Sequence, residues 1–340
     1  MSLYIFNLKN AIKFLLFLIP MVFILPFSAY SKEVARLSVH WSPKHHCAKH
    51  AQMFAEKVYY MSEGKLRIEV FPSKQLFGIR EVMGAVTSGA VELGGIVGVV
   101  SFPPINKNFN IASFPGLFSS YDEQRGFFKE SDIGSEIWSK ITEKTNSKLI
   151  MYNPVGPVMT FSSARELKGI DSMKDLKARR LLKSEVPMWK AYGAKYVSMP
   201  TGEVYTSLQS GMIDTINSPP QSIGAYDWWE FLKYAQKPYQ YFADAYIMAN
   251  SDWFNSLSTE LQEIVIKAGN EVGAISTNTI LGAGENTLSE FQKRGGIITS
   301  LAGSEKDKFD KLMNDKVMPE MAKMMDSKTL DAAKKYVSQK

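Results

Sequence analysis

The sequence predicts an α/β protein that is built from two lobes. Segments with alternating hydrophobic residues and segments with a helical period follow one another from residue 36, and again from about residue 148. From residue 258 onward the pattern is mostly helical. A length of 340 residues with 45% hydrophobic residues is sufficient for two ordinary hydrophobic cores.

The first region begins with the alternating segment "RLSVHW" (36–41), which predicts a strand. Ser42 and Pro43 follow, and these residue types are typical of an N-cap and of a first helical position. The predicted helix ends near Gly64. Its hydrophobic residues recur at helical spacing: Cys47, Ala51, Phe54 and Val58.

The remaining segments alternate in the same way along the chain. A strand over 65–72, a helix over 81–88 and a strand with glycines over 90–100 complete the first region. The second region has expected strands at 148–156, 158–163 and 196–200, helices at 184–193 and 201–214, and strand character over 245–257. This alternation predicts mainly parallel sheets with a cleft between two lobes, where ligands commonly bind.

The N-terminus is typical of a secretory signal peptide over residues 1–31. Lys9 and Lys13 precede the hydrophobic run 14–27, and Ala29 and Ser31 occupy the small-residue positions of a cleavage site. The run is short for a membrane span, although an uncleaved anchor is the alternative. The sequence therefore predicts an exported protein, for which the periplasm is the location that the resemblance described below implies.

Charge, cysteine content and missing motifs exclude several classes of function. The net charge of +6 becomes +4 without Lys9 and Lys13, which is too small to indicate nucleic-acid binding. A single cysteine excludes an internal disulfide. The sequence also lacks the nucleophile elbow, the zinc-protease motif, the P-loop and the dinucleotide-binding motif. We therefore expect neither an enzyme nor a cofactor.

At residues 62–78, 172–184 and 192–214 the chain resembles the solute-binding proteins of tripartite ATP-independent periplasmic (TRAP) transporters, the DctP-like family. "SEGKLRIEVFPSKQLFG" (62–78) is similar to the second-strand segment of the family. "SMKDLKARRLLKS" (172–184), followed by "YGAKYVSMPTGEVYTSLQSGMID" (192–214), resembles its most recognisable block. "IASFPGLFSSYDEQ" and "SDWFNSLSTELQEIV" match looser segments.

The resemblance implies a type II-like periplasmic-binding-protein fold with hinge strands, a long connecting helix and a ligand cleft between the lobes. The implied lobes are 32–155 plus 244–283, and 156–243 plus 284–340 with the C-terminal helices. The family captures a small-molecule solute by closing the lobes and delivers it to the small and large permease subunits. We expect a monomer. A receptor for a membrane sensor would use the same closure and remains an alternative.

The resemblance also implies pocket positions, at which this sequence differs from the family. The family arginine that pairs with the ligand carboxylate falls at Leu182, and a second arginine falls at Val158. Val97 stands near an acidic position, while Asn217 and Ser218 occupy the pocket positions after the next strand. Leucine and valine cannot form the two parallel hydrogen bonds that an arginine side chain donates to a carboxylate. We therefore expect an aromatic or hydrophobic monocarboxylate, or else a neutral solute.

Arg180 shares a strand face with Leu182 and is a candidate substitute for the missing arginine. A solvated surface pair formed by Arg179 and Arg180 is the alternative that we expect. Trp228 is a candidate lid over the ligand, although one of the adjacent residues Trp228 and Trp229 should serve packing alone.

The segment "HWSPKHHCAKH" (40–50) holds all four histidines and the only cysteine. We expect His40, Trp41 or His45 to contact the ligand by stacking and hydrogen bonding. A zinc site with His46 and His50 as ligands is the alternative, because they are spaced as i and i+4 on a helix. No carboxylate cluster lies nearby in the sequence, so we expect no metal.

Overall fold

The structure is a computed structural model that describes residues 33–340. The predicted signal peptide at residues 1–31 lies outside the described residues. Within residues 33–340, no helix combines the length and the apolar character that crossing a lipid bilayer requires.

The first lobe is built on a five-stranded sheet with the order β2-β1-β3-β10-β4. β1 pairs in parallel with β2 and with β3, whereas β10 runs antiparallel to β3 and to β4. The strands are β1 (Glu33–Ser38), β2 (Leu66–Phe71), β3 (Leu93–Val97), β4 (Ser147–Tyr152) and β10 (Ala245–Asn250).

The second lobe is built on a six-stranded sheet with the order β11-β9-β5-β8-β6-β7. β5 is antiparallel to both β8 and β9, and the other pairs are parallel. The strands are β5 (Gly156–Ser162), β6 (Lys177–Arg180), β7 (Lys195–Ser198), β8 (Thr215–Ser218), β9 (Tyr234–Ala243) and β11 (Ile297–Ser300).

Both sheets are therefore mixed, and the expectation of mainly parallel sheets is wrong for the strands near the crossings. The chain enters the second sheet through β5 and returns through β9, and these neighbours run in opposite directions. β10 then enters the first sheet against the direction of β3. Because the chain crosses to the second sheet and returns beside its point of entry, the strands next to the crossings pair antiparallel.

The helices carry the connections between strands. Those of the first lobe are α1 (His46–Met61), α2 (Val82–Thr87), α3 (Gly98–Ser101), α4 (Tyr121–Glu130), α5 (Asp132–Lys144) and α9 (Ser251–Ser256). Those of the second lobe are α6 (Val186–Ala191), α7 (Val204–Gln209) and α8 (Pro220–Ala225). The remaining helices are α10 (Thr259–Lys293), α11 (Gly303–Leu312), α12 (Met318–Ala322) and α13 (Ser327–Ser338).

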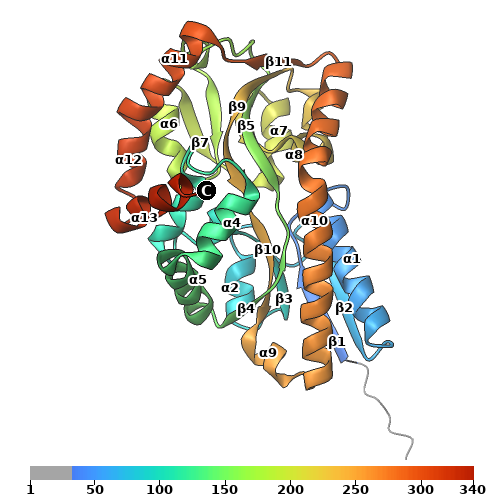
Figure 1. Cartoon of the computed structure of the whole chain (residues 1–340). Helices are drawn as coiled ribbons and strands as arrows, with labels where there is room; N and C mark the ends of the chain where they lie inside the picture. Colours follow the sequence, from blue (N-terminus) through green and yellow to red (C-terminus); the bar gives the residue numbers. More distant parts are fainter. Residues whose placement is uncertain (1–32) are drawn as a thin grey trace, which may run out of the picture. The chain divides into compact units, whose positions relative to one another are not determined.

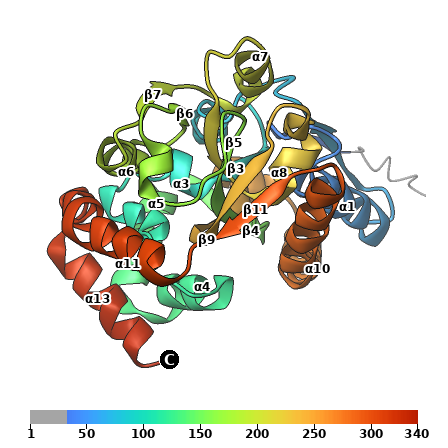
Figure 2. The ribbon, with the colours of Figure 1, turned by 90° about the horizontal axis from the view of Figure 1, so that it is seen from above.

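Two short crossings and one long helix connect the lobes. The chain changes sheets between Tyr152 and Gly156 and again at Asp244. The helix α10, 35 residues long, packs on β4 and α1 of the first lobe and on α8 and β5 of the second (Figure 1). Viewed from above, α1 and α10 lie side by side (Figure 2). The exact lobe boundaries stay a prediction, and α13 packs on α4 and α5 of the first lobe.

Most of the expected elements are present, and the start of the first helix differs. The stripe Cys47, Ala51, Phe54 and Val58 is fully buried on α1. The N-cap is His45 and not Ser42, because His45 Nδ1 accepts a hydrogen bond from the backbone N–H of Cys47. The hydroxyl of Ser42 instead donates to the carbonyl of Ala225 on the second lobe.

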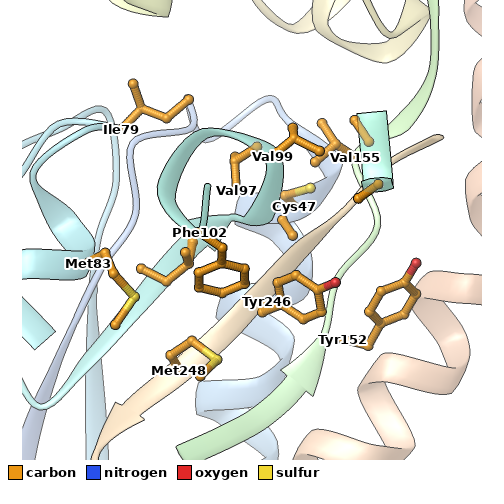
Figure 3. Close-up of a cluster of buried hydrophobic side chains, with 14 of the residues drawn as sticks. Cys47, Ile79, Met83, Val97, Val99, Phe102, Tyr152, Val155, Tyr246 and Met248 are labelled. Atoms are coloured by element: carbon orange, nitrogen blue, oxygen red, sulfur yellow. The ribbon is translucent and has the colours of Figure 1, made fainter. Parts of the chain in front are cut away.

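The hydrophobic core of the first lobe extends up to the cleft. Figure 3 shows Cys47 among buried side chains that include Val97, Val155 and Tyr246. Val97 and Val155 also line the cavity described next. The core therefore supports one wall of the candidate site directly.

Candidate functional site

A small cavity of about 50 Å³ lies between the lobes and is lined by residues of both. Its walls are mostly hydrophobic and aromatic. Seven predicted site residues line it, namely His40, Trp41, Val97, Val158, Asn217, Ser218 and Trp228. Whether they contact a solute stays a prediction. We call this space the inner cavity.

Sequence reasoning did not identify Arg179 as a cavity residue, yet its side chain is only 3% exposed and lines the inner cavity. The expectation that Arg179 is solvated is therefore wrong. Its Nε donates to the carbonyl oxygen of Met199 at 3.1 Å, and its Nη2 donates to Thr201 Oγ1 at 3.0 Å. These two bonds fix the guanidinium at the end of β6.

The strand end explains why Arg179, and not Leu182, lines the inner cavity. β6 ends at Arg180, and the chain then turns because Glu185 Oε2 accepts the backbone N–H groups of Leu181 and Leu182 at 2.7 and 3.0 Å. Leu182 is buried but faces a different, larger cavity, and the partly exposed Arg180 lines that cavity as well. Leu182 therefore does not line the inner cavity, and Arg179 supplies the guanidinium there.

Arg179 has no carboxylate partner among the described residues. Of its five N–H donors, two are bonded, which leaves three for the cavity. Burial lowers the pKa of Arg179 to about 10, and the nearby Glu185 opposes this shift without forming an ion pair. The group remains charged at neutral pH. Leaving a buried guanidinium without an ion-pair partner is costly, and a carboxylate or another anion would offset this cost.

A polar network forms another part of the wall. Asn217 Oδ1 accepts from Thr160 Oγ1 at 2.9 Å and from Gln240 Nε2 at 3.2 Å. Asn217 Nδ2 donates to Glu185 Oε1 at 3.4 Å. These bonds fix the orientation of the Asn217 amide at the end of β8.

His40 is a neutral group in this site. Burial is the main cause that lowers its pKa to about 3, and the charge of Arg179 contributes. Its Nδ1 is shielded from solvent and has no hydrogen-bond partner among the described residues. His40 therefore offers a polar atom without a second positive charge.

The histidine-rich segment connects the two lobes. Burial lowers the pKa of His45 well below its usual range, so the ring is neutral. Because its Nδ1 accepts a bond, its proton lies on Nε2, which donates to Ser222 Oγ on α8 at 3.1 Å. Lys44 pairs with Asp227 at 2.7 Å on the same side. His45 thus borders the cleft without lining the inner cavity.

The alternative of a metal site is supported by the short distances between candidate ligand atoms, but most of these atoms already form hydrogen bonds. Ligand atoms of His45, His46 and Cys47 lie within 4.8 Å of one another. However, His45 Nδ1 is occupied by a backbone N–H, and His46 Nε2 donates to the carbonyl of Pro154 at 2.9 Å. His50 Nδ1 bonds Asn153 Oδ1 at 3.3 Å. The hydrogen bonds favour packing over metal ligation.

The two adjacent tryptophans have different surroundings. Trp228 is buried, lines the inner cavity and stacks on Tyr226 with 4.9 Å between ring centroids. Trp229 instead carries the guanidinium of Arg294 over its ring at 4.3 Å. Trp228 is therefore a wall residue, and Trp229 packs against the end of α10.

Comparisons with known proteins agree with this architecture. Residues 37–324 match the model of the family described as bacterial extracellular solute-binding protein, family 7. The C4-dicarboxylate-binding periplasmic protein DctP of Rhodobacter capsulatus is 23% identical over 84% of this chain and 85% of its own. The sialic acid-binding periplasmic protein SiaP of Vibrio cholerae is 25% identical over 73% of this chain and 77% of its own.

Solved structures with low sequence identity share the two-lobe fold. The galactonate complex of DctPAm from Advenella mimigardefordensis has a TM-score of 0.83 at 17% identity, covering 90% of this chain and 98% of that one. DctP7 of Bordetella pertussis, which binds pyroglutamic acid, has a TM-score of 0.80 at 19% identity. The match covers 88% of this chain and 99% of that one. The chain therefore belongs to bacterial extracellular solute-binding protein family 7, the DctP family of TRAP transporter solute-binding proteins.

Proposed function

We propose that this protein captures a small organic acid between its lobes and delivers it to a TRAP membrane permease. The observation that carries this proposal is Arg179, a buried guanidinium with three free N–H donors and no ion pair with a described carboxylate. Leaving such a charge buried and unpaired is costly, whereas a ligand carboxylate would accept two parallel hydrogen bonds from it.

The surroundings of Arg179 narrow the class of acid. Arg179 is the only cation in the described walls of the inner cavity, and the neighbouring His40 is neutral. The inner cavity is therefore suited to one acid group. Trp41, Trp228 and Tyr241 add aromatic walls, which favour a hydrophobic or aromatic body. We propose an organic acid with a hydrophobic or aromatic body, such as an aromatic or hydrophobic monocarboxylate, one carboxylate of which binds Arg179 in the inner cavity.

The ligands of related proteins support an acid. The structural relatives include proteins that bind pyroglutamic acid, galactonate and succinate, and each of these ligands is an acid. Because these proteins are less than 21% identical to this chain, they do not identify its solute.

Binding by lobe closure needs no catalytic step or cofactor. The contacts His45–Ser222 and Lys44–Asp227 would form on closure, since they join the two lobes. We propose that the protein acts as a monomer in the periplasm and that its closed form docks on the small and large permease subunits.

A thermal-shift screen of residues 32–340 against organic acids, sugars and neutral metabolites tests this function, because a ligand of the folded state raises Tm. We expect acids to raise the Tm of the wild type and of Arg67→Gln, a control at an exposed arginine of β2. Arg179→Gln should abolish the shift, and Arg179→Lys should retain a smaller one. Acid shifts that survive Arg179→Gln, or hits among neutral compounds alone, would overturn the proposal.

A further inference from the structure

A second, larger cavity of about 810 Å³ adjoins the inner cavity, and Val99 and Leu181 line both. We call it the outer cavity. The first lobe contributes residues of α2, α3 and the end of α5, and the second contributes the segment after β6. The outer cavity therefore also lies between the lobes.

The charged residues of the outer cavity all have the same sign. Arg80 and Lys144 come from the first lobe, and Arg180 and Lys183 come from the second. The described walls include no aspartate or glutamate. Four cations around one space favour an anion between them.

None of these four cations forms an ion pair within residues 33–340. Arg80 bonds only a neutral group, donating from Nη2 to Ser198 Oγ across the cleft at 3.2 Å. Closing the lobes brings Arg80 and Lys144 towards Arg180 and Lys183, and like charges resist this approach. An anion bound between them would offset the repulsion and stabilise the closed state.

The outer cavity also offers an uncharged donor and a hydrophobic surface. The hydroxyl oxygen of Ser101 is shielded from solvent and has no hydrogen-bond partner among the described residues. Val100, Ile105 and Leu182 supply apolar wall nearby. This combination suits an organic group that ends in an oxyanion.

The sizes of the two cavities indicate that one solute would occupy both. A buried water needs about 10–15 Å³ of such space, so the inner cavity holds only about four water-sized groups. That is enough for a carboxylate and one or two carbons. The rest of an organic acid bound to Arg179 must extend past Val99 and Leu181 into the outer cavity.

We propose that the outer cavity is a second anion subsite, which takes the distal carboxylate, phosphate or sulfate of an elongated solute whose first acid group binds Arg179. This inference rests on the proposed function and extends it. The inner cavity accepts one acid group, the shared walls contact the hydrophobic middle, and Arg180 and Lys183 face the second acid group. Free inorganic phosphate or sulfate could bind the same four cations, so the experiment must distinguish it from the distal acid group of a solute.

Calorimetric titration with straight-chain diacids of four to ten carbons, and with monoacids of equal length, tests this subsite. Phosphate and sulfate form a third arm. The variants are Arg180→Gln combined with Lys183→Gln, and Arg179→Gln. Lys195→Gln, an exposed lysine on β7 outside both cavities, is the matched control.

We expect a diacid of the right length to bind at least tenfold more tightly than its monoacid. The double variant should remove this advantage, while Lys195→Gln should retain it. Equal affinity of diacids and monoacids at every length, with binding still dependent on Arg179, would overturn the subsite alone. Phosphate or sulfate binding that depends on Arg180 and Lys183, without a diacid advantage, would overturn the link to the solute. If the wild type binds none of the acids, the proposed function itself is overturned.

Discussion

The hydroxyl of Tyr152 donates a 2.5 Å hydrogen bond to the carboxyl group of Asp244, and the two residues lie at the two crossings between the lobes. Tyr152 ends β4 before the chain enters the second sheet, and Asp244 connects β9 to β10 on the return. Tyr246 donates a second bond to Asp244 at 3.0 Å. One buried carboxyl group thus connects both crossings.

We predict that Asp244 makes stability fall as the pH rises. Burial is the main cause that raises its pKa from 3.8 to about 7. The folded state therefore holds this proton more tightly than the unfolded state, and its stabilising effect is full below pH 3.8 and lost as the pH passes 7. Between pH 5 and 7.5 the wild type should lose about 2.5 kcal/mol of unfolding free energy relative to Asp244→Asn. Urea unfolding at several pH values measures this difference.

The difference between wild type and variant isolates Asp244 from groups that act in the opposite direction. The buried His40 and the partly buried His46 have lowered pKa values, so their contribution to stability rises with pH. Tyr152→Phe is the matched control, because it removes one hydrogen bond and keeps the titrating group. Parallel stability curves for the wild type and Asp244→Asn would refute the prediction.

The sequence predicted the elements with regular hydrophobic patterns and missed those in which buried polar groups interrupt the pattern. β1, β2 and α1 were found because their buried residues alternate or recur regularly. β9 was missed because Gln236 and Gln240 are buried in it. Gln236 Nε2 bonds the carbonyl of Leu167 at 2.7 Å, and Gln240 Nε2 bonds Thr160 at 2.8 Å. Such pairing depends on distant residues, which local periodicity does not reveal.

The family resemblance assigned Val97 and Val158 to the pocket, and both line a cavity between the lobes. Val97 and Val158 line the inner cavity because they lie on β3 and β5 beside the crossing. Arg179 was assigned to the surface because two adjacent arginines give no indication of which one faces inward. The answer depends on where β6 ends, and Glu185 sets that end through backbone contacts.

Thr201 should act by positioning Arg179. Its Oγ1 accepts the Nη2–H of Arg179 at 3.0 Å. Thr201→Val keeps the shape and removes the acceptor, and a hydrogen bond to a charged group contributes about 1.5–3 kcal/mol. We expect the affinity for the best acid of the thermal-shift screen to fall about tenfold or more by calorimetry. Thr201→Ser, which retains the hydroxyl, should bind like the wild type.

A double-mutant cycle separates positioning from a direct contact with the solute. If Thr201 acts through Arg179, Thr201→Val should have little further effect in the Arg179→Lys background, where the fork is already lost. Equal losses in both backgrounds would show that Thr201 contacts the acid by itself.

Cys47 should be chemically inert in the folded protein. Its side chain is fully buried, and burial raises the pKa of its thiol well above the usual value. Because the thiolate is the reactive form, an aromatic disulfide reagent should label no thiol at pH 7.5 in native buffer and one thiol in denaturant. Labelling of Cys47 that is as slow as the unfolding of the whole protein would support this prediction. Rapid labelling of the native protein would show that α1 opens near the cleft.

Two glycines of α10 should respond oppositely to alanine. A Cβ on Gly269 would lie 2.2 Å from the carbonyl oxygen of Ile150 on β4, so backbone would have to move. A Cβ on Gly282 meets nothing within 4 Å. We expect Gly269→Ala to lower the free energy of unfolding by about 1–3 kcal/mol through overpacking. Gly282→Ala should raise it by up to about 1 kcal/mol through helix propensity. Urea unfolding compares the two, and similar values would mean that α10 does not pack closely on β4.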